Sequence, residues 1–221
     1  MPTRRDLVRA LEEAAGAKNV LWRPEDLAVY EFDGTIERST PHAVVLPGTA
    51  EEVAKVVRAC NRFGVPITPR GAGTGLSGGS VPAKRGVVIG TGWLRQIIEI
   101  DKQNRLAVVE PGVPNLELSK AAAPFGLFYA PDPSSQQACT IGGNVAENAG
   151  GPHCLALGVT QNHVLGIEIV TADGDITWLG GRVPDSFGYD LRGIFIGSEG
   201  TLGVATKVVV RLVPLPASVI T

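Results

Sequence analysis

The stretch from Pro69 to Ser80 contains the residues of this 221-residue chain whose types and spacing point most clearly to chemistry. It reads Pro-Arg-Gly-Ala-Gly-Thr-Gly-Leu-Ser-Gly-Gly-Ser and follows a short apolar segment, residues 65–68, that we expect to form a strand. Glycine has no Cβ, so backbone N–H groups can turn towards one point and a ligand can come close. A concave row of such amides binds anions. With Arg70 and the hydroxyls of Thr74 and Ser77 beside it, the stretch predicts a cradle for a diphosphate.

Three other interpretations of this stretch fit less well. A flexible linker would be more polar and would not lie between apolar segments. Gly73, Gly75 and Gly78 match the pattern G-x-G-x-x-G, but a Rossmann motif needs a helix that begins on its last glycines. Pro82 and the glycines after it disfavour such a helix. A P-loop requires Gly-Lys followed by Ser or Thr, and that sequence is missing here.

Two more segments with few large side chains follow. Residues 131–151 end in Ile-Gly-Gly-Asn-Val-Ala-Glu-Asn-Ala-Gly-Gly, which would let a flat ring lie against backbone, with Asn144 and Asn148 as hydrogen-bonding groups. A tightly packed helix of small residues is an equally good interpretation. Residues 197–203, Gly-Ser-Glu-Gly-Thr-Leu-Gly, lead into an expected strand. No Ser–His–acid arrangement or close carboxylate pair stands out, so we expect the chemistry to belong to a cofactor.

The segments around these stretches predict a mixed α+β domain. Tyr30 and Asp33 fit two interpretations, side chains that face a site or a surface turn around Gly34, and we favour the turn. Amphipathic periodicity, caps and terminal glycines predict helices at 3–15, between a Thr49–Glu52 capping box and Gly64, at 114–126, and, shorter, at 190–195. Apolar runs bounded by turn residues predict strands at 43–46, 65–68, 86–89, 96–100, 106–109 and 204–213, with a hairpin at 163–178 turning at 173–174.

Composition excludes several classes of function. The net charge is −2 and aromatic residues make up 5% of the chain, which argues against nucleic-acid binding. No apolar run approaches the roughly 18 residues of a membrane span, and we expect no signal peptide. Cys60, Cys139 and Cys154 have no C-x-x-C spacing, which fits reduced thiols in a cytoplasmic protein, and Cys60 is expected in the core. His153 and His163 form no metal-binding pattern, so we expect structural histidines and no metal.

Taken together, the three stretches resemble the FAD-binding (PCMH-type) domain of the vanillyl-alcohol oxidase/p-cresol methylhydroxylase superfamily. The likeness is greatest to the FAD-binding subunit of glycolate oxidase and to D-lactate and D-2-hydroxyglutarate dehydrogenases, over about residues 20–216. The resemblance implies an α+β fold of two α+β subdomains with FAD extended between them. It also implies an N-terminal helical lead-in at 1–37, subdomains at 38–100 and 101–216, and the start of a substrate domain at 217–221.

The resemblance assigns residues to FAD. The first stretch would bind the diphosphate, the second would surround the ribityl chain and the flavin, and residues 199–204 would lie near the adenosine. Relatives with a covalent flavin use a histidine near the position of Thr74, so FAD is expected to be non-covalent. The implied cofactor-binding residues are Arg70, Gly71, Ala72, Gly73, Thr74, Gly75, Ser77, Gly78, Pro131, Asp132, Ser135, Thr140, Gly142, Gly143, Asn144, Asn148, Gly150, Glu199, Gly203 and Val204.

The resemblance further implies an oxidoreductase that oxidises a 2-hydroxy acid of glycolate or D-lactate type by hydride transfer to flavin. Iron–sulfur and second flavin-type subunits are implied as partners, in the cytoplasm or peripheral to the inner membrane. Relatives continue into a histidine-bearing substrate domain, so we nominate no catalytic residue and expect this chain alone to be inactive. A flavin-holding scaffold subunit without turnover is the alternative. The related cell-wall enolpyruvyl reductase fits residues 144–151 poorly.

Overall fold

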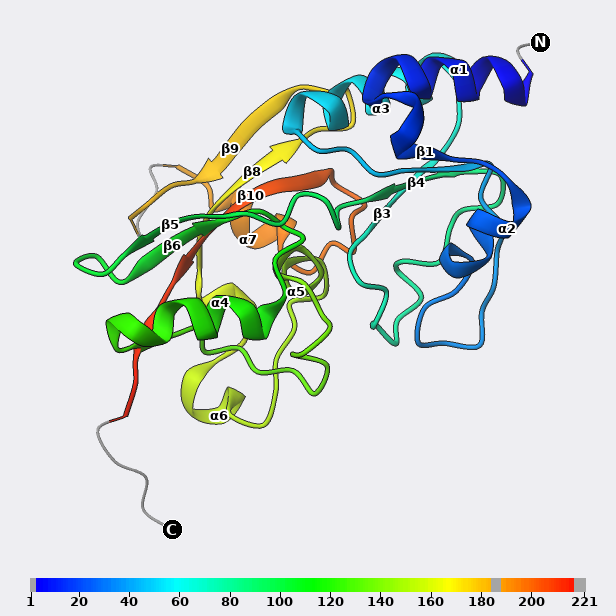
Figure 1. Cartoon of the computed structure of the whole chain (residues 1–221). Coiled ribbons are helices and arrows are strands. Elements are labelled where there is room, and N and C mark those ends of the chain that lie inside the picture. The colour runs from blue at the N-terminus through cyan, green and yellow to red at the C-terminus, as the bar shows by residue number, and fades with distance from the viewer. Residues whose placement is uncertain (1–2, 184–187, 217–221) are drawn as a thin grey trace.

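Two β-sheets with helices packed against them make up the structure, a computed structural model that describes residues 3–183 and 188–216 (Figure 1). The strand order is β1-β2-β4-β3 in the first sheet and β5-β6-β10-β8-β9 in the second, and β11 pairs with β7. This arrangement confirms the predicted α+β class. The strands are β1 Val20–Leu21, β2 Ala43–Val45, β3 Ile67–Arg70, β4 Val87–Gly90, β5 Ile97–Asp101, β6 Leu106–Val109, β7 Leu127–Phe128, β8 Val164–Val170, β9 Ile176–Gly180, β10 Val204–Arg211 and β11 Val213–Pro214.

The helices connect and cover these strands. They are α1 Arg4–Ala15, α2 Pro24–Leu27, α3 Ala50–Phe63, α4 Asn115–Ala122, α5 Ile141–Glu147, α6 Cys154–Leu157 and α7 Leu191–Phe195, with short 3₁₀ turns at Ala17–Asn19, Ala28–Tyr30, Ala123–Phe125 and Thr160–Asn162.

The first sheet comes from the amino-terminal part of the chain. Strands β2 and β3 run parallel to β4, which lies between them, and β1 pairs antiparallel with β2. Helices α1 and α3 lie side by side over one face (Figure 1), where Val53 and Cys60 are fully buried. Leu27 packs with Val44 and Val88 on the other face, because successive strand residues point to opposite faces. Both faces are therefore covered, and Cys60 lies in the core as predicted.

The beginnings of α1 and α3 differ in their capping. Thr3 and Asp6 form a reciprocal capping box at α1, with each side chain accepting a hydrogen bond from the backbone N–H of the other residue. Of the two hydrogen bonds of the capping box predicted at Thr49, only the one accepted by the Thr49 side chain forms, and the prediction of the other is wrong. Thr49 Oγ1 accepts from the N–H of Glu52 at 3.1 Å, but the Glu52 carboxylate accepts from the N–H of Gly48 at 2.7 Å. The glutamate side chain reaches one residue further back, into the turn before the cap.

The second sheet is antiparallel throughout. Helices α4 and α5 lie below it in Figure 1, and Leu118 of α4 and Ile141 and Val145 of α5 pack against Ile167 and Val208 of the strands. All five residues are completely shielded from solvent. The second sheet therefore holds α5 in place through an apolar core, which leaves the opposite side of α5 available for a ligand.

Helix α3 joins the two sheets. Its apolar cluster with the first sheet also includes Val170 and Val204 from the second sheet. Asn61 Nδ2 donates to the carbonyl of Ala172 at 2.6 Å, and Arg58 pairs with Asp175 at 3.3 Å. These contacts fix the β8–β9 turn against α3, so the sheets pack as one unit.

Most predicted elements form within a few residues of their expected bounds, including the β8–β9 hairpin and helix α7. Residues 141–147 form a helix, which was one of the two interpretations of that segment. The predicted subdomain boundary after residue 100 falls inside β5, Ile97–Asp101, and the division stays a prediction. The predicted start of a substrate domain at 217–221 lies outside the described residues.

Candidate functional site

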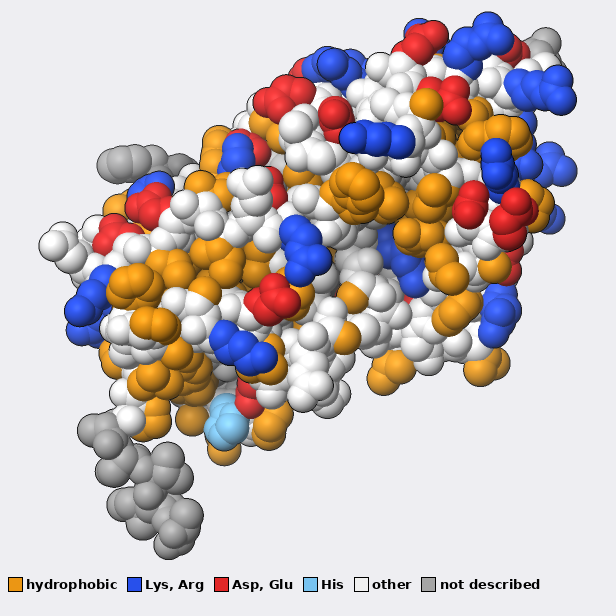
Figure 2. Space-filling model, viewed as in Figure 1, with side chains coloured by type: hydrophobic (Ala, Val, Ile, Leu, Met, Phe, Trp, Pro, Cys, Tyr) orange, Lys and Arg blue, Asp and Glu red, His pale blue; other side chains and the backbone are white. Residues whose placement is uncertain are grey.

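Three segments far apart in the sequence meet around one cavity of about 290 Å³. They are the loop after β3, the segment that leads into and forms α5, and the loop before β10. Figure 2 shows this face of the molecule hollowed near its centre. The sequence-predicted residues that line the cavity are Arg70, Gly71, Ala72, Gly73, Thr74, Gly75, Ser135, Thr140, Gly142, Gly143, Asn144, Glu199, Gly203 and Val204. The structure thus brings most of the predicted set together.

The first segment leaves the carboxyl end of β3 and folds back over it. Gly73 has φ +71, a backbone conformation that residues other than glycine rarely adopt. The loop also lies very close to α5, because a Cβ on Gly71 would be 2.6 Å from Thr140 Oγ1. The N–H of Gly34 donates to the carbonyl of Gly75 at 2.9 Å and ties the far side of the loop to the segment after α2.

Arg70, the last residue of β3, places a buried positive charge at the cavity. Its side chain is 7% exposed, Nη1 donates to the carbonyl of Ser80 at 3.1 Å, and Cζ lies 5.8 Å from the centre of the Tyr30 ring. Burial lowers the pKa of Arg70, while nearby Asp33 and Tyr30 oppose that shift. Within the described part of the chain no carboxylate lies within 4.0 Å of it. A buried arginine without a close anion is suited to bind one from a ligand.

Asp33 lies behind the first segment and is buried, although the sequence analysis favoured a surface turn here over a side chain that faces a site. The residue is 7% exposed, and its Oδ1 accepts from the N–H and hydroxyl of Thr35 at 2.8 and 2.7 Å. Burial raises the pKa of Asp33, but the hydrogen bonds from Thr35 and the positive charge of Arg70 outweigh it and hold the pKa below its ordinary value. Asp33 is therefore a buried negative charge near Arg70.

Helix α5 presents one face to the cavity. Thr140 caps the helix by accepting from the N–H of Gly143, and Asn148, at φ +49, ends it. Thr140, Gly143, Asn144 and Glu147 recur at helical spacing, and all of them line the cavity. Asn144 is 1% exposed, and its Nδ2 has no hydrogen-bond partner within the described residues. The two interpretations of this segment are thus compatible, because a small-residue helix itself forms the wall.

The third segment is attached to the end of α5 by backbone hydrogen bonds. The N–H of Gly197 donates to the carbonyl of Val145, and that of Glu199 donates to the carbonyl of Ala146, both at 2.9 Å. Glu199 has φ +52, which is uncommon for a residue with a side chain. These bonds hold the loop against the helix, so the glutamate side chain stands at the rim of the cavity.

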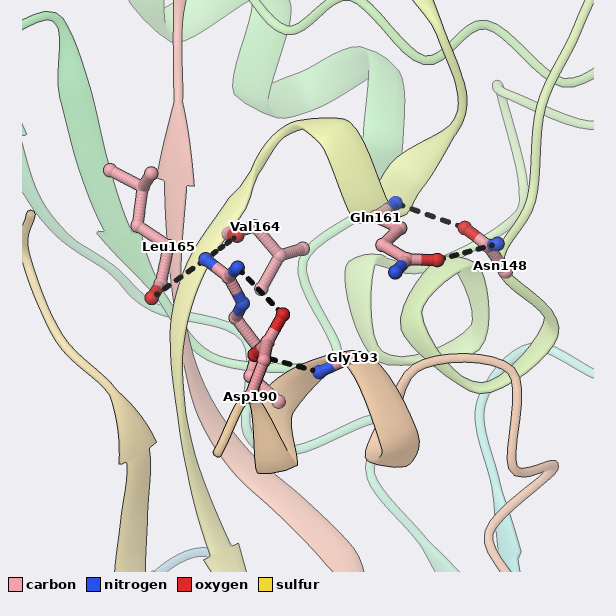
Figure 3. A network of polar contacts seen from close by, with 7 residues as sticks. Asn148, Gln161, Val164, Leu165, Asp190 and Gly193 are labelled. Atoms are coloured by element: carbon pink, nitrogen blue, oxygen red, sulfur yellow. Dashed lines mark hydrogen bonds and ion pairs between the residues drawn. The ribbon is translucent and has the colours of Figure 1, made fainter. Parts of the chain in front are cut away.

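Phe195 of helix α7 also lines the cavity, and an adjoining polar network fixes that helix (Figure 3). Asp190 caps α7 by accepting from the N–H of Gly193 at 3.1 Å. Arg192 Nη1 donates to the carbonyl of Val164 at 2.9 Å, which ties α7 to the beginning of β8. The network positions Phe195 without placing any charge in the cavity.

Six predicted residues lie outside the cavity lining: Ser77, Gly78, Pro131, Asp132, Asn148 and Gly150. Ser77 Oγ donates to Glu147 at 3.0 Å, and the carbonyl of Pro131 accepts from Asn115. Asp132 pairs with the exposed His153. Asn148 exchanges hydrogen bonds with Gln161, as Figure 3 shows. These residues support the walls of the site, and their part in ligand binding stays a prediction.

The sequence analysis did not place several lining residues in the site. Thr91 and Pro111 come from the bends after β4 and β6, Phe195 from α7 and Ala205 from β10. The others lie inside the three stretches without having been assigned individually: Pro69, Leu76, Gly79, Ser80, Pro133, Ser134, Cys139, Val145, Ala146, Glu147, Ala149 and Gly200. Thr91 stands between two glycines directly after a strand, which is the same signal that marked the first segment. Phe195 had no comparable signal.

Reactive side chains are scarce around the cavity. Burial raises the pKa of the Cys139 thiol, so this lining residue is poorly suited to act as a thiolate. Neither the buried His163 nor the exposed His153 lines the cavity. Within residues 3–183 and 188–216, no group of three His, Cys, Asp or Glu side chains is arranged to hold a metal ion. No helix in the same residues is long and apolar enough to cross a membrane.

Sequence comparison finds close relatives among flavin enzymes. The chain is 48% identical over 214 residues to "Glycolate oxidase subunit GlcD" of Escherichia coli (strain K12), covering 96% of this chain and 43% of that protein. It is 42% identical over 191 residues to "D-lactate dehydrogenase" of Archaeoglobus fulgidus, covering 84% of this chain and 43% of that protein. It is 38% identical to "D-2-hydroxyglutarate dehydrogenase" of Xanthomonas citri pv. viticola, covering 95% of this chain and 45% of that protein. The chain thus spans less than half the length of these relatives.

Solved structures and a family model agree with these relatives. The fold matches p-cresol methylhydroxylase with a TM-score of 0.84 at 26% identity, covering 97% of this chain and 44% of that one. It matches alkyldihydroxyacetonephosphate synthase with a TM-score of 0.86 at 23% identity, covering 98% of this chain and 42% of that one. These likenesses confirm the predicted PCMH-type fold. The family model described as "FAD binding domain" matches residues 41–180. This chain therefore belongs to the family of FAD binding domains.

Proposed function

We propose that this chain holds FAD non-covalently for an enzyme that oxidises a 2-hydroxy acid to the corresponding 2-oxo acid. The observation that carries the proposal is the convergence of the three glycine-rich segments on one cavity, with the buried Arg70 at its wall. The names of the relatives support a substrate of glycolate or D-lactate type. The activity belongs to the whole protein, because the residues described here match less than half of those relatives.

The cavity fits FAD on its own chemistry. A diphosphate needs hydrogen-bond donors and positive charge, which the first segment offers through its amides, Arg70 and the Thr74 hydroxyl. The buried Nδ2 of Asn144, without a partner in the described residues, matches an acceptor on a ligand. Gly143 lines the cavity, and a Cβ there would meet only Thr140 Oγ1 within 4 Å, so its missing side chain leaves room for a planar ring close to α5.

The residues of this chain bind and orient, and FAD supplies the acceptor for the two electrons of the substrate. Arg70 would neutralise the diphosphate, and the hydrogen bond from the N–H of Gly34 to the carbonyl of Gly75 would hold the loop around it. None of the lining residues is a histidine, and Thr74 occupies the place where covalent relatives are expected to carry one, which supports a non-covalent flavin. No histidine of the described residues lines the cavity, and we assign the removal of the substrate's hydroxyl proton to no residue of this chain.

The partners and the location are also proposals. The relative in Escherichia coli is called a subunit, which supports a multi-subunit assembly in which iron–sulfur and second flavin-type subunits take the electrons from the flavin. The three cysteines are free thiols, which supports a cytoplasmic protein or one bound peripherally at the inner membrane.

Anaerobic reduction of the flavin in the full-length protein tests the function. We expect glycolate or D-lactate to bleach the visible absorbance of bound FAD and to yield one 2-oxo acid per flavin. An L-2-hydroxy acid with a chiral carbon serves as the matched control and should react much more slowly. If the flavin is reduced by dithionite but by none of the 2-hydroxy acids, the substrate class is wrong while the FAD site stands.

A further inference from the structure

Two loops project from the first sheet and carry apolar side chains at their tips. They comprise residues 31–39, before β2, and residues 71–80, after β3 (Figure 1). Ile36 is 95% exposed, Leu76 79% and Phe32 37%, and we call these three residues the tip patch. Figure 2 shows apolar side chains at the edge of the molecule to which the loops point. A single exposed apolar residue is ordinary, but a group drawn from distant segments marks a contact surface.

The backbone brings the two loops together. The N–H of Gly34 donates to the carbonyl of Gly75 at 2.9 Å. A Cβ on Gly34 would lie 2.7 Å from Leu76 Cδ2, so the leucine side chain rests on the backbone of the other loop. Gly34 lies midway between Phe32 and Ile36 in the sequence. The tip patch is therefore built by the fold from segments far apart in the chain.

The tip patch borders the mouth of the cavity. Leu76 lines the cavity although most of its side chain is exposed, so it lies where the cavity meets solvent. A leucine offers neither charge nor hydrogen bonds to a diphosphate, and covering it removes apolar surface from water, which is favourable. Leu76 is therefore suited to contact a protein surface that closes the mouth.

The charges around the tip patch do not favour a lipid surface. Glu37 and Arg38 are the exposed charged residues of 31–39, and their charges cancel, while residues 71–80 carry no charge. Anionic headgroups attract segments with an excess of Lys and Arg. Arg38 Cζ also lies 4.8 Å from the centre of the Phe32 ring, so this cation already has a contact within the chain. A protein surface is therefore the better occupant.

The length of the relatives indicates which protein surface can reach the tip patch. The 221 residues match less than half the length of those relatives, so more of such a protein lies outside these residues than within them. The part that handles the substrate must border the cavity, because hydride passes only between atoms held close together. The tip patch offers exposed apolar surface at that border.

We infer that the part of the full-length protein outside these 221 residues packs on the tip patch and closes the mouth of the cavity. This inference rests on the proposed function and deepens it, because it names the residues of this chain that meet the substrate-handling part. Ile36 and Leu76 insert among apolar side chains of that part, which also keeps water from the cavity.

Cysteine labelling of the 221-residue chain and of the full-length protein tests this inference. Ile36→Cys places the thiol at an exposed position outside the cavity lining, where bound FAD does not shield it directly. We expect a maleimide to label it at least about 10-fold more slowly in the full-length protein, because thiol reactivity follows exposure. Glu13→Cys, at an exposed position on α1, is the matched control and should react equally in both proteins. Mass spectrometry assigns the label to its peptide and separates it from the native cysteines.

Equal labelling of Ile36→Cys in the two proteins would overturn the inference. Slow labelling of the 221-residue chain that accelerates on dilution would overturn it too, because a second copy would then be the occupant. Protection of the full-length protein that requires vesicles of anionic phospholipid would assign the tip patch to a lipid surface and also overturn it. The proposed function is judged separately, since labelling needs no substrate. Protection of Ile36→Cys in a protein whose flavin no 2-hydroxy acid reduces would reject the substrate class and keep the inference.

Discussion

Replacing Gly75 by leucine is expected to weaken FAD binding at least about 100-fold while the chain stays folded. Gly75 lines the cavity, and a Cβ there would touch only the Glu147 side chain, at 3.5 and 3.8 Å. A leucine side chain therefore meets little protein and extends into the space that the ligand needs. Titration of the chain with FAD, followed by flavin fluorescence, measures the loss.

Gly92→Leu is the matched control for this substitution. Gly92 is exposed and outside the cavity lining, and a Cβ there would meet no atom within 4 Å. We expect both variants to unfold near the same temperature without FAD, and only the Gly92 variant to gain thermal stability when FAD is added. Normal FAD affinity in the Gly75 variant would show that the ligand lies elsewhere.

Removing the charge of Arg70 is expected to weaken FAD binding about 100-fold, because charge-assisted hydrogen bonds to a phosphate contribute about 1.5–3 kcal/mol each. Arg70→Met keeps an unbranched apolar side chain and removes the guanidinium, including its contact with the Tyr30 ring. Arg70→Lys should weaken FAD binding less, by about 10-fold, because lysine keeps the positive charge but not the planar pair of hydrogen-bond donors. Isothermal calorimetry at two salt concentrations measures both.

The stability of the ligand-free variants separates binding from folding. Replacing Arg70 by methionine removes its hydrogen bond to the Ser80 carbonyl, so the free energy of unfolding should fall by about 1–3 kcal/mol while the ligand-free chain stays folded. If the Met variant binds FAD as tightly as the unchanged chain, Arg70 does not contact the phosphates. If it unfolds in the absence of ligand, its role is structural instead.

The segments that form the site could be predicted because their signals are local. Glycine at close spacing after the apolar run 65–68 indicated the first loop, and the run of small residues within 131–151 indicated the second segment. Helices α1 and α3 and the β8–β9 hairpin also follow from periodicity and turn residues within a few positions. Each of these signals depends on neighbours in the sequence.

What the sequence did not predict depends on contacts between distant residues. Asp33 is buried because Gly34 bonds to Gly75, some forty positions away, and nothing near Asp33 in the sequence indicates that contact. Asn148 was predicted beside Asn144, but it ends α5 in a left-handed conformation and bonds to Gln161 instead of lining the cavity. Phe195 lines the cavity because core packing and the Arg192 hydrogen bond to Val164 hold α7 against residues distant in the sequence, with Asp190 capping the helix.

The central claim is that three distant segments bind one FAD together, and hydrogen–deuterium exchange of the 221-residue chain with and without FAD tests it most directly. The account predicts that FAD slows exchange in residues 69–80, 139–151 and 197–204 together, with the same dependence on FAD concentration. The exposed faces of α1 and α3, which lie outside the cavity lining, should not change. Protection confined to one segment, or absent from all three while FAD is bound, would contradict it.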